Sequence, residues 1–117
     1  MASNPLPVGL KYALLDAVIT LHLDWDRTNP EQPLIALNGK ARSIREICDL
    51  VLSHDAIERA PEELKEELVG QMQKPQYGAL RGSFDGSYAS AARCLLQLMD
   101  DRIKDREQLD ELRRDRS

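Results

Sequence analysis

The chain has 117 residues, with 16 Lys and Arg against 20 Asp and Glu, and so a formal net charge of −4. This length fits one domain, and the mild acidity disfavours dedicated binders of nucleic acid or anionic membranes, which depend on clustered Lys and Arg. Two cysteines, Cys48 and Cys94, do not make a disulfide framework, and we expect both as reduced thiols in the core. The composition therefore predicts a single, soluble, cytoplasmic domain.

A first helix is predicted over about residues 8–26. Its apolar run cannot span a membrane, because Lys11, Asp16, His22 and Asp24 interrupt it. The helix is nevertheless apolar over most of its circumference. We therefore expect it either at the centre of a helical bundle or buried by a second subunit.

The following connection, over residues 27–42, contains two prolines and an Asn-Gly pair. Asn38-Gly39 fits either a type I′ hairpin turn or the left-handed cap of a short helical turn over residues 34–37. Strict alternation of apolar and polar residues is missing on both sides. The sequence pattern therefore favours the helical turn.

Two further helices are predicted between residues 43 and 73. Ser43 followed by Glu46 is a capping-box pattern, and the helix that it starts should end near residues 59–60, before Pro61. Pro61 is a suitable first residue for the next helix, which should reach Gln73. This region is acidic, since residues 55–67 carry six acids against two bases.

Residues 74–86 are predicted as a glycine-rich loop, and residues 87–114 as a long helix capped by Asp85 or Ser87. The glycines at 78, 82 and 86 permit an anion site at the helix start or plain turns, and the lysine of a phosphate loop is missing. Eleven of the fifteen residues from 102 to 116 are charged. The chain thus predicts an all-α fold: a small four-helix domain over 1–103, with 104–117 as a charged helical extension or a disordered tail.

His22, His54 and Asp55 are predicted on the apolar faces of two helices, where unpaired polar groups are costly. The segment LSHDAIERAPEEL resembles the His-Asp region of HD-domain phosphohydrolases of the guanosine tetraphosphate hydrolase branch. The resemblance implies a divalent metal held by His22, His54 and Asp55, with Glu58 near a metal-bound water. It covers about 13 residues, and Arg59 stands where that branch carries a second acid. The alternative without a metal is that His22 and His54 are core or interface histidines and that Asp55 caps the turn into the next helix.

A helix-turn-helix reader of DNA is a further alternative. Lys40, Arg42 and Arg45 form a small basic cluster before the two helices. The second of these helices, however, is strongly acidic, and phosphates would repel it. Nucleic-acid binding is therefore not expected.

The remaining pattern favours association with protein. No complete catalytic set is visible, and Leu109 and Leu112 would be unpartnered on a lone helix. The leading hypothesis is a small non-enzymatic adaptor or regulatory protein of bacterial type, homodimeric, without a cofactor. A metal-dependent phosphohydrolase and a transcriptional regulator are the alternatives. The expected contact residues are Glu62, Glu63, Glu66, Glu67, Leu109 and Leu112.

Overall fold

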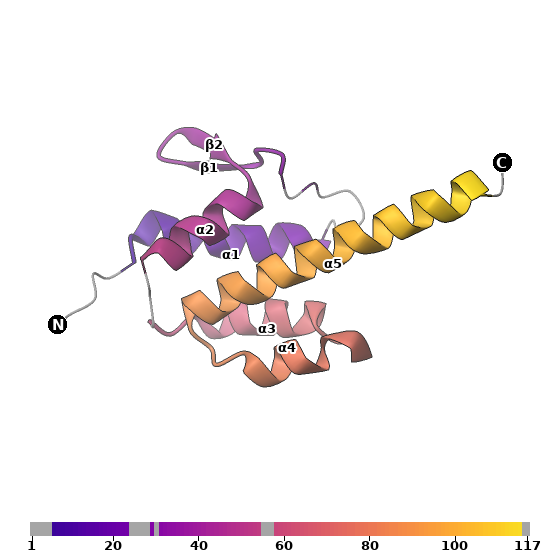
Figure 1. Ribbon diagram of the computed structural model, residues 1–117. Coiled ribbons are helices and arrows are strands. Elements are labelled where there is room, and N and C mark those ends of the chain that lie inside the picture. Colours follow the sequence, from indigo (N-terminus) through magenta and orange to yellow (C-terminus); the bar gives the residue numbers. More distant parts are fainter. Residues whose placement is uncertain (1–5, 24–28, 30, 55–57, 116–117) are drawn as a thin grey trace.

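The computed structural model describes residues 6–23, 29, 31–54 and 58–115, and the statements below concern these residues (Figure 1). They form five α-helices, one 3₁₀ helix and one two-stranded hairpin. The mainly helical fold predicted from the sequence is confirmed, although the element count exceeds four helices. The elements in chain order are α1 (Val8–Leu23), β1 (Ile35–Leu37), β2 (Lys40–Arg42), α2 (Ile44–Ser53), α3 (Glu62–Gln71), η1 (Pro75–Tyr77), α4 (Gly78–Ser83) and α5 (Tyr88–Asp115).

Helix α1 lies at the centre of the domain, which is one of the two positions predicted from its apolar circumference. It packs against α2, α3, α5 and β1. Its buried side chains are Leu10, Ala13, Leu14, Ala17, Val18 and Leu21. On the opposite side, Val8, Tyr12 and Leu23 remain exposed, so the domain leaves part of the apolar surface of α1 uncovered.

The connection before α2 is a hairpin, and the predicted helical turn is wrong. Strands β1 and β2 pair antiparallel with Ile35 opposite Arg42. Asn38 and Gly39 both have positive φ, 55° and 76°, as a type I′ turn demands. Ile35 is buried in the core next to α1, so tertiary packing supports strands that are too short to show alternation.

Helix α2 begins where its capping pattern predicts and ends earlier. The Ser43 side chain accepts a hydrogen bond of 3.1 Å from the Glu46 amide. The helix stops at Ser53 instead of residues 59–60, with His54 as its C-cap. Beyond it, the Glu58 carbonyl accepts from the Tyr88 amide and the Ala60 amide donates to the Gly86 carbonyl. These distant backbone bonds hold residues 58–60 in an extended conformation.

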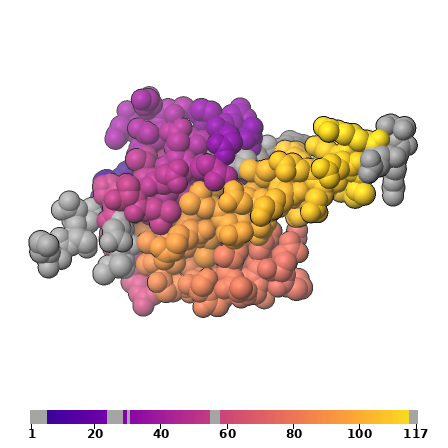
Figure 2. All heavy atoms as spheres, viewed as in Figure 1, coloured from indigo at the N-terminus to yellow at the C-terminus, as the bar shows by residue number. Residues whose placement is uncertain are grey.

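The segment predicted as a loop over residues 74–86 contains η1 and α4. Helix α5 then starts with both predicted caps in use, since Ser87 accepts from the Ser90 amide and Asp85 accepts from the Ser87 amide. Figure 1 shows α5 crossing the domain and continuing beyond it. In Figure 2 the same end projects from the rest of the molecule. The longest dimension of the whole molecule is 58 Å. The exposed side chains of residues 104–114 follow from this projection.

Candidate protein-interaction surfaces

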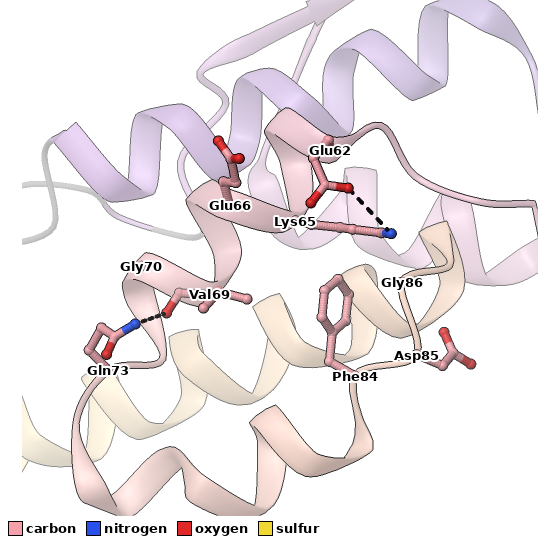
Figure 3. A pocket seen from close by; sticks show the side chains of 9 residues that line it. All are labelled: Glu62, Lys65, Glu66, Val69, Gly70, Gln73, Phe84, Asp85 and Gly86. Carbon is pink, nitrogen blue, oxygen red and sulfur yellow. Dashed lines mark hydrogen bonds and ion pairs between the residues drawn. The ribbon is translucent and has the colours of Figure 1, made fainter.

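A groove of about 540 Å³ lies between α3 and the segment that leads into α5 (Figure 3). Two separate segments of the chain, residues 62–73 and residues 84–86, form this groove. Its lining residues are Glu62, Lys65, Glu66, Val69, Gly70, Gln73, Phe84, Asp85 and Gly86. We call this the α3 groove.

The apolar part of the α3 groove comes from Val69 and Phe84. Val69 is 37% exposed, and the half-buried Phe84 ring points from its loop toward α3 in Figure 3. Phe84 directly follows α4, and Gly86 turns the chain into α5 with φ of +85°. A Cβ built on Gly86 would lie 2.8 Å from Lys65 Cε, so the loop packs closely on α3.

The polar part of the α3 groove is acidic. Three carboxylates, those of Glu62, Glu66 and Asp85, line it together with the ammonium of Lys65, and the neighbouring Arg59 guanidinium donates to the Asp85 carbonyl. Lys65 Nζ is 3.6 Å from Glu62 Oε2, an exposed pair of small energy. Hydrogen bonding by Ser90 and Ser87 holds the pKa of Asp85 well below its usual range, so this carboxylate stays ionised at neutral pH.

The four acids that the sequence suggests as contact residues lie on two different faces of α3. Glu62 and Glu66 line the α3 groove, whereas Glu63 and Glu67 are absent from its lining. Glu67 instead approaches α1, where its Oε2 lies 3.6 Å from Nδ1 of His22. The helical spacing of these acids therefore places two on each side of α3.

The projecting end of α5 is a second candidate surface. Leu109 and Leu112 are 56% and 57% exposed. They lie three residues apart and so share one face of the helix. They form a small apolar area on the part of α5 that has left the domain.

Two of the three suggested metal ligands, His22 and His54, lie among the described residues. His22 is exposed in the last turn of α1, not central on its apolar face as predicted, because Ala13 and Ala17 occupy the interior. His54 is half-buried at the C-cap of α2, and Asp55 lies outside the described residues. Among the described residues, no cluster of three or more His, Cys, Asp or Glu side chains could hold a metal ion.

Glu58, which the resemblance places near a metal-bound water, has a different partner. Its Oε1 forms an ion pair with Lys11 Nζ, and this hydrogen bond lowers the pKa of Glu58. Lys11 also lies over the Tyr88 ring, 5.9 Å from its centroid. The carboxylate thus ties α1 to the segment before α3.

The basic cluster suggested for DNA binding is largely paired within the chain. Arg42 is 3.4 Å from Glu46, and Arg45 NH2 is 2.8 Å from Asp100 Oδ1. Arg45 also pairs with Glu31. Binding phosphates would require these arginines to exchange partners.

The glycine segment before α5 has a structural explanation. Gly78 and Gly82 lie in α4, and only Gly86 has a positive φ among the three. At the start of α5, the amides of Ser87, Tyr88, Ser90 and Ala91 already donate to acceptors of the chain itself. An anion would have to displace these bonds.

Comparisons of the chain with protein-family models, with curated proteins and with solved structures find no match in any of the three. Across the part of the chain that the structure describes, no helix is both long enough and apolar enough to cross a membrane.

Two acids of the α3 groove, Glu62 and Glu66, are among the contact residues expected from the sequence, whereas Asp85 was expected only as a helix cap. Val69, Phe84 and Gly86 were not expected as parts of one site. A partial signal was present at Phe84 and Gly86, since an aromatic residue beside glycine in a short segment is compatible with a surface contact. Their approach to α3 depends on the tertiary fold.

Proposed function

We propose that the protein is a small, cytoplasmic, non-enzymatic helical adaptor or regulator that acts by binding proteins and assembles as a homodimer. The observation that carries this proposal is the end of α5, which leaves the domain with Leu109 and Leu112 in solvent. The acidic surface of α3 is the proposed contact region for a different partner.

The end of α5 benefits from a second chain for two physical reasons. The segment from residue 104 to residue 115 extends α5 by about 18 Å, and this end of the helix lacks the tertiary packing that supplies most helical stability in proteins. Burial of a leucine contributes roughly 1.5–3 kcal/mol when it is complete. A partner that covers both leucines would therefore stabilise the helix and gain binding energy together.

A second copy of the chain is the occupant that we propose for this face. Residues 104–117 contain five bases and five acids, so two such segments carry no net charge that would separate them. A two-fold dimer also presents the same surface on both chains, and it is the commonest oligomer of soluble proteins. Self-association through Leu109 and Leu112 is compatible with the zero net charge of the segment and with a two-fold symmetric contact.

Sedimentation equilibrium of the full chain tests the proposal. We expect about twice the chain mass of 13.2 kDa at micromolar concentration. The double substitution Leu109→Ser/Leu112→Ser should weaken self-association at least about tenfold, since apolar burial is lost at both positions. Gln108→Ser/Glu111→Ser is the matched control, because it alters the same turns without removing an apolar side chain. A monomeric wild-type chain, or equal effects of the two variants, would contradict the proposal.

The metal-dependent and DNA-binding alternatives are not carried further. His22 approaches Glu67, Glu58 pairs with Lys11, and two of the three residues of the basic cluster, Arg42 and Arg45, have carboxylate partners. These contacts give the residues in question structural roles.

A further inference from the structure

We infer that the α3 groove binds a basic amphipathic helix of a partner protein. This inference rests on the proposed function and names the chemistry of the partner that the adaptor would hold. Three features of the groove carry it: its shape, its apolar strip and its charge.

The shape of the α3 groove fits a short helix. The groove follows α3 from Glu62 to Gln73, at positions three or four residues apart on one face. Helix α3 itself is about 15 Å long, which corresponds to between two and three turns of a bound helix. Gly70 is exposed and contributes no side chain to the lining, so a partner can approach the backbone at this point.

The apolar strip offers a docking position for one or two aliphatic side chains. Val69 and Phe84 come from opposite sides of the groove, and Figure 3 shows Val69 directed toward the space beside the Phe84 ring. Peptide helices that dock in grooves insert apolar anchors at i, i+3 or i+4 and i+7. An amphipathic helix supplies such anchors, whereas an extended polar peptide does not.

The charge of the α3 groove selects a basic helix. Glu62 is 74% exposed in its side chain, so its carboxylate can reach a partner. Glu66 and Asp85 add two further negative charges, and these three carboxylates outnumber the two neighbouring cations, Lys65 and Arg59. The neighbouring acids Glu63 and Glu67 increase the negative potential around α3. Such a surface attracts Lys and Arg and disfavours acidic helices, nucleic acids and anionic lipids.

The end of α5 of a second copy is a poorer occupant of this groove. It is amphipathic, but its five acids offset its five bases over residues 104–117. Charge complementarity therefore favours a helix with an excess of bases from a different protein.

Fluorescence anisotropy with designed peptides tests the inference on the full chain. The probe is a labelled peptide of about 14 residues, with leucines at i, i+3, i+4 and i+7 and lysines elsewhere. A second peptide replaces every lysine by glutamate, and a third scrambles the leucines off one face. We expect micromolar binding of the first peptide and at least about tenfold weaker binding of the other two.

Charge variants on α3 locate the binding. Glu62→Gln/Glu66→Gln should weaken binding about fivefold, because both carboxylates line the groove. Glu63→Gln/Glu67→Gln is the matched control on the same helix, with the same change in net charge, and should alter binding less than about twofold. Equal weakening by both pairs would overturn the inference, since it would indicate attraction by net charge alone.

An apolar variant completes the test. Val69→Gln should weaken binding about tenfold, whereas Leu34→Gln, at a similarly exposed position far from the groove residues in the sequence, should leave it unchanged. Absence of binding, or equal binding of the scrambled peptide, would overturn the inference. Sedimentation distinguishes this failure from that of the proposed homodimer, because the groove variants leave Leu109 and Leu112 intact.

Discussion

Cys48 is fully buried on the inner face of α2, between α2 and its neighbours in the core. Burial raises the pKa of its thiol to about 12, with a smaller contribution from Asp49. Cys94 is also buried, and burial raises the pKa of its thiol as well. Both cysteines are free, as expected from the sequence.

We expect Cys48 to resist thiol reagents in the folded protein. At pH 8 its thiolate population would be about one in ten thousand, and the reagent would also lack access. Labelling with an aromatic disulfide should be negligible in buffer and should reach two thiols per chain in urea. Rapid labelling of Cys48 without denaturant would contradict the burial described above.

Asp85 gives a second expectation at the residue scale. Hydrogen bonding by Ser90 and Ser87 lowers the pKa of this carboxyl in the folded chain. Because the folded pKa lies below the unfolded one, the stabilisation is complete above the unfolded pKa and disappears as the pH falls through the folded value. Asp85→Asn should therefore lower the melting temperature at pH 7, and the difference should narrow below about pH 4.

Thermal melts of both proteins between pH 7 and pH 3 measure this effect. Asp49→Asn, at an exposed position of α2, controls for the loss of one negative charge. A destabilisation by Asp85→Asn that is the same at every pH would contradict the role assigned to the ionised carboxylate.

The position of His22 shows the limit of prediction for single residues. Leu15 and Ile19 are large apolar side chains that lie beside His22 at helical spacing, and they lead to the prediction that His22 is on the apolar face of α1. The structure buries Ala13 and Ala17 instead, and Leu15 and Ile19 are only half-buried. Small residues allow neighbouring helices to approach closely, and their contribution to a buried face is not visible from hydrophobic size alone.

Among the elements, the glycines of the segment before α5 allow a paired test. Gly86 has φ of +85°, and an added Cβ would lie 2.8 Å from Lys65 Cε. Gly82 lies in α4, with nothing within 4 Å of an added Cβ. The two glycines should therefore respond in opposite directions to the same substitution.

Gly86→Ala should reduce the free energy of unfolding by about 1–2 kcal/mol, since a left-handed backbone is unfavourable for alanine. Gly82→Ala should increase it by about 0.5–1 kcal/mol, because alanine favours the helix. Urea unfolding of the two variants beside the wild type gives both values. Stabilisation by Gly86→Ala would contradict the turn geometry at the start of α5.

The elements also differ in how far the sequence predicts their ends. The start of α2 was predictable, because its cap is a bond between Ser43 and Glu46 three residues apart. Its end was not, because residues 58–60 form backbone bonds with residues 86–88. The prediction of a helical turn in place of the hairpin was wrong for a related reason: Asn38-Gly39 fits two structures, and contact with α1 favours the hairpin.

For the whole molecule, the sequence predicted a mainly helical fold and an acidic α3, but not the α3 groove. The acids follow from local composition, whereas the groove requires Phe84 and Gly86 to meet α3 across the fold. Similarly, the uniform apolar character of α1 indicated a central or shared helix. Its contacts with α2, α3 and α5 show that the domain itself covers most of it.

The central claim is that the end of α5 joins two copies of the chain. A single spin label at Glu111→Cys, between the two leucines, reports on this contact, since Cys48 and Cys94 are buried and should remain unlabelled. We expect dipolar coupling between labels on two chains, with one well-defined distance that disappears on dilution with unlabelled protein. Absence of such coupling at concentrations where the chain is fully folded would contradict the claim.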